Sequence, residues 1–342
     1  MRQLIQNLYD QKNLTEEEMK QVAITIFSGK LSDAEMGALL LALKIKGETV
    51  EEITGLAKVM QELALKIPGV AYHVMDNCGT GGDRSGSFNI STTAAFILAA
   101  AGIPVAKHGN RSISSKSGSA DVLSELGIEM ATTPEKIAHL LKKANLTFLF
   151  APNVHPKMKQ ITAVRKQLAT ATIFNIIGPL TNPIPLNSQL MGVYRRDLLE
   201  VIASVLKNLG RERAVVINGP GGMDEAALHG VNHLAILKKN EITKLQFTPE
   251  DIGLPSYSLS EIQGGDARFN AEILQSVLRG EPGAYLDTVL LNAGLGLFAC
   301  GKAKTMNEGI REAKDIVACG KALAKLKEVQ EKQKEIRSSC HF

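Results

Sequence analysis

The chain has 342 residues, of which 44% are hydrophobic and 22% charged, and its 39 basic and 35 acidic residues give a formal net charge of +4. This composition is typical of a soluble globular protein, the length suggests two domains, and so small a charge excess does not indicate nucleic-acid binding. The longest apolar run, residues 94–106, is interrupted by Gly102 and Pro104, and it is shorter than the roughly 20 residues of a membrane helix.

Cysteine usage indicates a reduced, cytoplasmic protein, because the four cysteines are far apart and form no CxxC pair. Residues 1–13 are amphipathic and lack the apolar core of a signal peptide. Cys78 lies next to a glycine-rich segment, where a nucleophile is conceivable. No activating partner is identifiable in the sequence, so a buried cysteine at the end of a strand is favoured.

Residues 1–66 show the pattern of several short amphipathic helices. Three capping boxes begin at Thr15, Ser32 and Thr49, each with a glutamate three residues later, and Gly29 and Gly47 end the first two helices. Apolar residues recur at helical spacing between these signals. Because so few helices expose more apolar surface than they can bury among themselves, we expect this unit, residues 1–70, to dock on the rest of the chain or on a second subunit.

From residue 71 onward, short apolar runs alternate with helical patterns, which is the signature of a mostly parallel sheet. The predicted strands are residues 72–76, 103–107, 146–150, 190–193, 213–218 and 233–237, and the predicted helices are 91–101, 119–126, 134–144, 156–168 and 196–209. A hairpin turn is predicted at 238–241, and residues 284–334 are almost entirely helical. The predicted fold class is therefore α/β, with a small N-terminal helical domain and a larger α/β domain, residues 71–342, that has a mostly parallel central sheet and C-terminal helices.

Polar loops are concentrated in one stretch near the start of the larger domain. Its motifs are a glycine run GTGGD (79–83), NIST (89–92), KHGNR (107–111) and a hydroxyl-rich segment (114–119). Ser91 or Thr92 is a suitable N-cap for the apolar helix that follows. A glycine turn that leads into a helix N-terminus presents N–H groups and a positive dipole end. The three loops, at the ends of adjacent strands, therefore predict a site for one anionic ligand.

The glycine run by itself is typical of an ordinary tight turn, and it fits no common phosphate-binding motif. A Walker loop is absent, because no Gly-Lys pair precedes Ser or Thr, and the dinucleotide fingerprint would need Gly or Ala where Arg84 stands. Gly294 and Gly296 match that fingerprint formally, but they lie in a long helical run with no preceding strand, which indicates helix packing. Only the combination with the neighbouring motifs makes the glycine run a specific signal.

Two later blocks carry groups suited to binding. Pro179 and Pro183 indicate a rigid loop downstream of Arg165, which lies on a predicted helix and by itself would be an ordinary surface charge. Asp224 and Glu225 follow a predicted strand and a glycine loop. Adjacent carboxylates there either hold a magnesium ion facing pyrophosphate or cap a following helix. Two histidines four residues apart lack the HExxH pattern and are expected to be structural: His229 and His233.

Together these motifs closely resemble the anthranilate phosphoribosyltransferase family, which is related in fold to pyrimidine nucleoside phosphorylases, and the resemblance covers nearly the whole chain. It implies transfer of the phosphoribosyl group from 5-phosphoribosyl 1-pyrophosphate to anthranilate, with Mg²⁺ as cofactor, in tryptophan biosynthesis. The products would be N-(5-phosphoribosyl)anthranilate and pyrophosphate. The resemblance also implies a homodimer formed through the helical domain, which would include part of residues 165–188.

The resemblance assigns site residues position by position. The residues implied to bind the donor are Gly79, Thr80, Gly82, Asp83, Ser87, Asn89, Ser91, Thr92, Lys107 and Ser119. The residues implied to bind the acceptor are Gly79, His108, Asn110, His155, Arg165, Gly178 and Pro179. The implied metal ligands are Ser91, Asp224 and Glu225. The guanidinium of Arg165 would pair with the anthranilate carboxylate, and catalysis would depend on positioning and electrostatics without a covalent intermediate.

The chain departs from the family pattern in one segment. Similar enzymes usually carry LGxRT before IFN, whereas this chain has Ala169 and Ala171 in place of the Gly and the Arg. The departure removes any role of that arginine in substrate access or structure and does not affect Arg165. Two alternatives share the fold, a nucleoside phosphorylase-like enzyme and a non-catalytic nucleic-acid-binding relative. The acidic pair and residues 151–183 disfavour the first, and the intact loop motifs disfavour the second.

Overall fold

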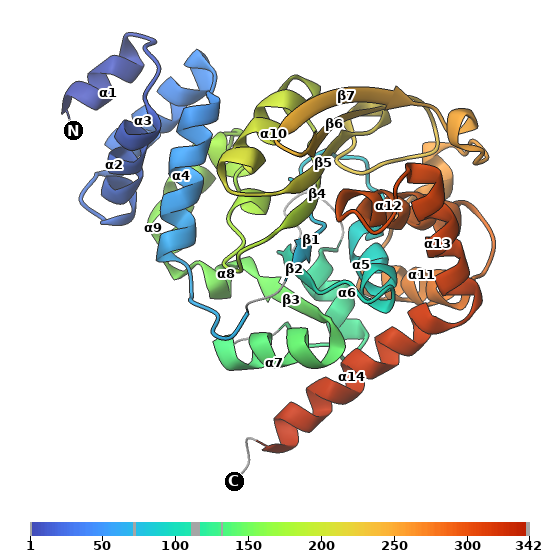
Figure 1. The fold of residues 1–342 in the computed structure, drawn as a ribbon. Helices are drawn as coiled ribbons and strands as arrows, with labels where there is room; N and C mark the ends of the chain where they lie inside the picture. Colours follow the sequence, from blue (N-terminus) through green and yellow to red (C-terminus); the bar gives the residue numbers. More distant parts are fainter. Residues whose placement is uncertain (1, 71–72, 111–116, 131–132, 340–342) are drawn as a thin grey trace.

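The structure is a computed structural model that describes residues 2–70, 73–110, 117–130 and 133–339. A small helical lobe lies beside a larger domain built on one seven-stranded sheet (Figure 1). Several residues considered in the sequence analysis lie outside the described residues: Tyr72 of the first predicted strand, Arg111 and residues 114–116 of the polar loops, and Cys340, the last of the four cysteines.

The lobe consists of α1 (Arg2–Tyr9), α2 (Glu16–Phe27), α3 (Asp33–Lys46) and α4 (Val50–Leu63). The three predicted capping boxes are confirmed, because each N-cap hydroxyl accepts a hydrogen bond from the backbone N–H three residues later. Glu52 of the last box is fully buried, and its carboxylate also accepts from the backbone N–H of Leu14 (2.9 Å) and from Nζ of Lys46 (2.9 Å). This carboxylate joins the start of α2 to the end of α3.

The sheet has the strand order β3-β2-β1-β4-β5-β6-β7. Its strands are β1 (Met75–Asp76), β2 (Val105–Gly109), β3 (Leu146–Phe150), β4 (Ser188–Gly192), β5 (Arg213–Asn218), β6 (Asn232–Lys238) and β7 (Glu241–Phe247). Neighbours from β3 to β5 run parallel, and β6 and β7 extend one edge antiparallel. The predicted parallel sheet and hairpin are confirmed, with Lys239 and Asn240 at positive φ in the turn.

Helices cover both faces of this sheet (Figure 1). One face packs against α5 (Ile90–Ala100), α6 (Ser119–Glu125), α11 (Ala267–Arg279), α12 (Ala284–Ala299), α13 (Met306–Ala318) and α14 (Lys321–Ser339), and the other against α10 (Leu199–Asn208) and the lobe. Side chains alternate between the two cores, as the pleat requires. Val215 and Ile217 of β5 belong to the first core, and Ala214 and Val216 belong to the second. The predicted α/β fold class is confirmed.

Two segments link the lobe to the sheet and the outer edge of the larger domain. The first is α9 (Lys159–Leu168), whose buried Ile161 and Val164 lie in the same core as α2, α3 and α4. The second is α8 (Ala151–Val154), which follows β3 and whose Val154 carbonyl accepts a hydrogen bond from the N–H of Leu65 (2.9 Å), just after α4; α7 (Pro134–Ala144) precedes β3. The chain after β3 therefore returns to the lobe and places residues 155–180 between the two parts of the molecule.

The boundaries of some elements differ from those predicted. The predicted N-cap Ser91 or Thr92 is wrong, because α5 begins at Ile90 with Asn89 as N-cap. β1 is shorter than the predicted 72–76, and the predicted helices 156–168 and 196–209 each begin with a short 3-10 turn before α9 and α10. The interpretation of Gly294 as a packing residue is confirmed, because a side chain there would overlap α13. In the described part of the chain, no helix is both long and apolar enough for a bilayer.

Candidate active site

The site begins where the glycine run leaves β1. The backbone N–H of Thr80 donates to the carbonyl of Gly192 (3.0 Å), at the end of β4, and the N–H of Gly81 donates to Oδ2 of Asp224 (2.6 Å). A side chain at Gly79 or at Gly192 would overlap Asp224. Both glycines therefore permit a close approach between the glycine run and the acidic pair, which an ordinary tight turn would not require.

Asp224 and Glu225 lie against N–H groups that suit an anion. Gly81 donates to Asp224, and the N–H of Ser91, in the first turn of α5, donates to Oε1 of Glu225 (3.2 Å). Burial raises the pKa of both carboxyls. The pKa of Asp224 is raised further by the neighbouring Asp83, and that of Glu225 by Asp224. The two neighbouring carboxylates thus accept hydrogen bonds from backbone N–H groups at a helix N-terminus and in a glycine loop.

Two buried asparagines fix the loop that carries the acidic pair. Asn292 of α12 accepts from the N–H of Ala226 (3.0 Å) and donates to its carbonyl (2.8 Å), and Asn232 of β6 does the same for Ala227 (2.9 Å and 2.8 Å). In this described segment the next element is β6, so the alternative that the acidic pair caps a following helix is wrong. The sequence did not indicate Asn292, which lies 66 residues from its partner.

The side chain of Lys107, on β2, places its ammonium group inside the molecule. The residue is 2% exposed, and Nζ donates to Oγ of Ser91 (3.1 Å) and to the carbonyl of Asn77 (3.5 Å). Its positive charge acts to lower the pKa of Glu225, which opposes the larger effect of burial. The structure therefore brings Lys107, Ser91 and the acidic pair together at the carboxyl edge of the parallel strands, where ligands of α/β proteins bind.

A buried carboxylate that the sequence analysis did not assign to the site lies beneath these groups. Asp76, at the end of β1, accepts from the N–H of His108 (3.2 Å), from Nδ2 of Asn182 (3.0 Å) and from Sγ of Cys78 (3.3 Å). Burial and the nearby Asp76 raise the pKa of the Cys78 thiol well above its ordinary value. A neutral, buried thiol is a poor nucleophile, which supports the structural role predicted for Cys78.

His108, on β2, and His155, directly after α8, pack against each other. Their ring centroids are 5.2 Å apart at an interplanar angle of 77°. Burial, with the neighbouring His155, lowers the pKa of His108 to about 3, and burial lowers the pKa of His155 to about 4. Both rings are therefore neutral near pH 7.

The tautomer of His108 follows from its partner. Nδ1 lies 3.1 Å from the carbonyl of Gly178, which can only accept, so Nδ1 carries the proton. The buried Nε2 is then an acceptor, and it has no hydrogen-bond partner among the described residues. The adjacent carbonyl of Pro179 is fixed by Nε2 of Gln189 (2.6 Å). A hydrogen-bonded loop thus fixes the orientation of an imidazole whose Nε2 is free to accept a hydrogen bond.

Arg165 projects from α9 beside the same loop. Its guanidinium carbon lies 5.7 Å from the centroid of the Phe174 ring, and burial lowers its pKa. The residue is half-buried and has no carboxylate partner among the described residues. An arginine that is stacked on an aromatic ring and lacks a counter-charge is well placed to receive a ligand carboxylate.

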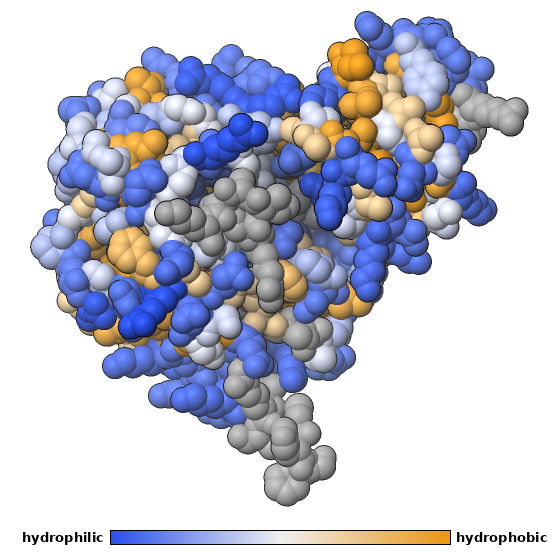
Figure 2. Space-filling view, turned by 180° about the vertical axis from the view of Figure 1, so that it is seen from behind, coloured by the Kyte–Doolittle hydropathy of each residue, from blue (hydrophilic) through white to orange (hydrophobic). Residues whose placement is uncertain are grey.

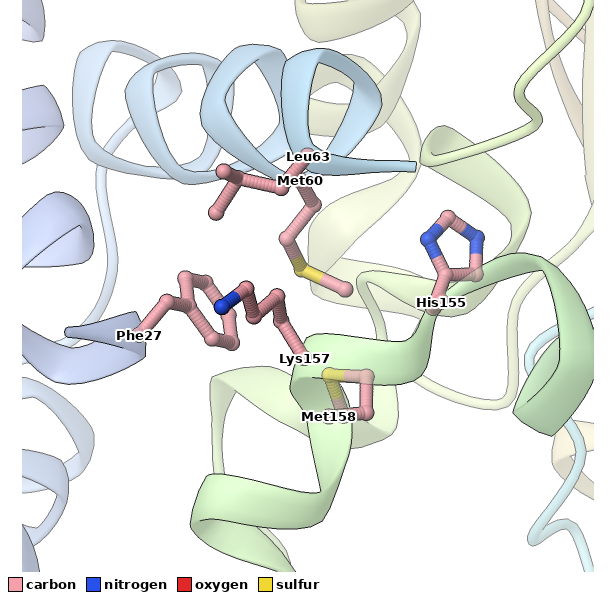
Figure 3. Close-up of a pocket in the computed structure, with 6 residues that line it drawn as sticks. All are labelled: Phe27, Met60, Leu63, His155, Lys157 and Met158. Carbon is pink, nitrogen blue, oxygen red and sulfur yellow. The ribbon is translucent and has the colours of Figure 1, made fainter. Parts of the chain in front are cut away.

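A small pocket opens at the junction of the lobe with the segment after β3. It is lined by Phe27, Met60, Leu63, His155, Lys157 and Met158 (Figure 3). The pocket is mainly apolar, and His155, one of its lining residues, also packs against His108. The lobe therefore supplies an apolar wall beside the polar site of the larger domain.

The remaining predicted ligand residues surround this centre. Asp83 accepts from the N–H of Ser85 (3.2 Å), and it acts to raise the pKa of Asp224. The Thr92 hydroxyl is buried without a hydrogen-bond partner among the described residues. Three others lie in loops, namely exposed Gly82, half-buried Ser87 and exposed Asn110, and Ser119 is the first residue of α6.

The oxygen atoms at this edge of the sheet suit a hard divalent cation. The donor set consists of two crowded carboxylates and the Ser91 hydroxyl, and a cation would offset both the burial and the mutual repulsion that raise the two carboxyl pKa values. No group of three or more His, Cys, Asp or Glu side chains with metal-binding geometry occurs in the described ranges. His229 and His233 accordingly form no such group.

A helical bundle joined to an α/β domain, with a glycine loop and an acidic pair at the carboxyl edge of the sheet, defines a glycosyltransferase of the two-domain type. The family described as "Glycosyl transferase family, helical bundle domain" matches residues 2–64, and "Glycosyl transferase family, a/b domain" matches residues 71–323. Within this class the chain belongs to the anthranilate phosphoribosyltransferase family, as its resemblance in sequence had indicated.

Relatives and solved structures of that name align over almost the full length. The chain is 60% identical to the anthranilate phosphoribosyltransferase of Listeria monocytogenes, covering 97% of this chain and 98% of the relative, and 55% identical to that of Streptococcus mutans, covering 97% and 99%. The crystal structure of the Thermus thermophilus enzyme superposes with a TM-score of 0.91 at 35% identity, over 96% of this chain and 98% of that one. A Saccharomyces cerevisiae structure, in complex with PRPP and Mg, shares the fold with a TM-score of 0.88 at 24% identity, over 96% of each chain.

Proposed function

We propose that the protein transfers the phosphoribosyl group of 5-phosphoribosyl 1-pyrophosphate to the amino group of anthranilate, which releases pyrophosphate and serves tryptophan biosynthesis. The observation that carries the proposal is the meeting of the acidic pair, the glycine run and the first turn of α5 at one edge of the sheet. Membership of the family named for this reaction supports the same conclusion.

The donor would lie along the glycine run and the first turn of α5. The N–H groups of Gly81 and Ser91 already hold carboxylate oxygens, and they have the geometry to hold phosphate oxygens instead. Lys107 adds a buried positive charge beside them. The other residues proposed to bind the donor are Gly79, Thr80, Gly82, Asp83, Ser87, Asn89, Thr92 and Ser119.

We propose Mg²⁺ as the cofactor, held by Asp224, Glu225 and the hydroxyl of Ser91. Such an ion supplies charge neutralisation for a leaving pyrophosphate. At that end of the site, the role of the protein's own residues is to position the ion. The acidic pair would hold the ion, and Asn292 fixes the backbone beside the pair.

The acceptor would lie between His108, Arg165 and the 178–179 loop. The Arg165 guanidinium would pair with the anthranilate carboxylate, and Nε2 of His108 would accept a hydrogen bond from the amine N–H. Because the pKa of His108 is about 3, the imidazole orients the amine and does not remove a proton before attack. The other residues proposed to contact the acceptor are Gly79, Asn110, His155, Gly178 and Pro179.

This arrangement accelerates the reaction by positioning and by electrostatics. A weakly basic arylamine attacks the ribose carbon without prior deprotonation while the bond from that carbon to the pyrophosphate oxygen breaks, and the nitrogen then loses its extra proton to solvent, so no protein nucleophile and no covalent intermediate are required. The test mixes the protein with anthranilate, 5-phosphoribosyl 1-pyrophosphate and Mg²⁺ and follows anthranilate fluorescence. Loss of fluorescence that requires all three components supports the proposal. A folded protein that leaves anthranilate unchanged under these conditions contradicts it.

We further propose that the protein is a cytoplasmic homodimer and that its lobe comprises residues 1–70 with part of 165–188. Three free cysteines among the described residues, Cys78, Cys300 and Cys319, suit a reducing compartment.

The lobe exposes large apolar side chains, and apolar residues gather on it in Figure 2. The most exposed of these are Tyr9 (49%), Ile24 (56%) and Ile45 (74%). Sedimentation of the protein and of Ile24→Glu tests whether this face forms the contact.

A further inference from the structure

A segment from the C-terminal half of the chain pairs with the arm that follows the glycine run. The N–H of Phe88 donates to the carbonyl of Ile262 (3.2 Å), and the N–H of Gly264 donates to the carbonyl of Gly86 (2.8 Å). The side chain of Gln263 adds a hydrogen bond from Nε2 to the carbonyl of Ser85 (2.9 Å). Residues 85–88 are therefore held from outside the sheet, by a segment that precedes α11.

Asn270 connects this segment to two loops of the proposed donor site. The residue lies on α11 and is 3% exposed. Its Oδ1 accepts from the N–H of Gly265 (2.8 Å), and its Nδ2 donates to Oδ1 of Asn89 (2.9 Å) and to Oγ of Ser117 (2.9 Å). Asn89 belongs to the motif that begins α5, and Ser117 lies just before α6. One buried amide thus joins both loops.

The orientation of each amide follows from donors and acceptors alone. The backbone N–H of Gly265 can only donate, so the atom of Asn270 that faces it is the carbonyl oxygen. The other end of Asn270 is then NH₂, which can only donate. The Asn89 atom that faces it is consequently the carbonyl oxygen, and the NH₂ group of Asn89 is turned away from Asn270. No described residue accepts a hydrogen bond from that NH₂ group.

We propose that Asn270 is a positioning residue for donor binding, which sets the polarity of the Asn89 side chain so that Asn89 presents N–H donors to the oxygen-rich phosphoribosyl donor. The inference rests on the proposed function, because it assigns a ligand to Asn89. Asn270 lies 181 residues from Asn89 and does not itself contact the ligand.

Asn270→Asp is the informative change. It keeps an oxygen for the N–H of Gly265 but replaces the NH₂ group by a second oxygen, which faces the Asn89 carbonyl. The Asn89 amide must then turn over, and its oxygen would face the donor. We expect the KM for 5-phosphoribosyl 1-pyrophosphate to rise about tenfold or more, which is the cost of a lost hydrogen bond and an opposed lone pair, while the KM for anthranilate changes less than about twofold. Asn270→Ala is a second variant if the buried aspartate impairs folding.

Two controls separate positioning from general damage. Gln333→Glu makes the same amide-to-acid change at a buried residue of α14, where the described hydrogen bonds of Gln333 go to the backbone of Glu129, and we expect both KM values to stay at wild type. In an Asn89→Ala background, Asn270→Asp should change the donor KM less than about twofold, because Asn270 acts through Asn89.

The decisive measurement is calorimetric binding of pyrophosphate with Mg²⁺, alongside the kinetic assay. If wild type lacks transferase activity yet binds pyrophosphate, the proposed function fails and the inference is judged by binding alone. Weaker binding by Asn270→Asp, absent when Asn89 is already alanine, supports it. Binding equal to wild type, an effect that adds in full to Asn89→Ala, or an equal effect of Gln333→Glu overturns it. Absence of pyrophosphate binding by wild type also overturns it.

Discussion

Acid should destabilise this protein through two buried histidines, and the size of the effect can be worked out. His108 and His155 are 4% and 5% exposed, and burial lowers their pKa values to about 3 and about 4. In the unfolded chain a histidine titrates near the ordinary value of 6.5. The native state therefore binds fewer protons, so the stability that each neutral ring contributes is present above pH 6.5 and is lost as the pH falls toward the folded pKa.

The magnitude follows from proton linkage. Between about pH 7.5 and about pH 5 the unfolded histidine gains a proton that the folded one does not, which lowers the free energy of unfolding by about 2 kcal/mol for each residue. Asp224 and Glu225 oppose this loss of stability at low pH. Because their pKa values are raised in the native state, protonation of the two carboxyls favours the native state. The wild-type curve alone is thus a sum of both effects, and only a comparison of variants isolates the histidine.

The assay is urea unfolding followed by circular dichroism at those two pH values. His155→Gln keeps a polar group near Thr181 but cannot titrate, so its loss of stability on acidification should be about 2 kcal/mol smaller than that of wild type. His139→Gln, at an exposed position of α7, is the matched control and should behave like wild type. Equal acid losses for wild type and His155→Gln, within about 0.5 kcal/mol, would refute the reasoning.

Other consequences can be tested on the same protein. Arg165→Lys should raise the KM for anthranilate by about 10- to 100-fold with little effect on the donor, and equal effects on both substrates would exclude the proposed pairing. Asp224→Asn with Glu225→Gln should raise the apo melting temperature, since crowded charges are removed, and should abolish stabilisation by Mg²⁺; an unchanged response to the ion contradicts the metal site. Ala169→Gly should stabilise the protein by about 1 kcal/mol, measured by urea unfolding, because φ is 48° there; a loss of stability would show that the alanine is not strained.

The order of elements could be read from the sequence because the signals are local. Each capping box spans four residues, so the hydrogen bonds between the N-cap residue and its glutamate form independently of tertiary structure. Apolar periodicity likewise predicted most helices and strands. Boundaries were less accurate where tertiary contacts decided them. Asn89 became the N-cap of α5, and Ser91 was left in the first turn with its N–H directed at Glu225.

The composition of the site was only partly predictable. The family motifs indicated the acidic pair, Lys107, His108 and Arg165 from residue type and order. Nothing in the sequence indicated Asp76, Asn270 or Asn292 as partners of His108, Asn89 and the backbone of Ala226. Each of them makes a hydrogen bond to a residue that is 32, 181 or 66 positions away. Such pairs have no sequence pattern, because their distance depends on strand order and not on spacing.

The sequence by itself thus determined which segments are helical or extended, which loops carry glycine and hydroxyl groups, and which family the chain resembles. Tertiary structure alone decided the protonation and direction of the site groups. Asp224 and Glu225 have raised pKa values because folding buries them beside other carboxylates, and His108 is neutral because folding buries it beside His155. Burial and the orientation of a hydrogen bond arise only when segments distant in the chain pack together.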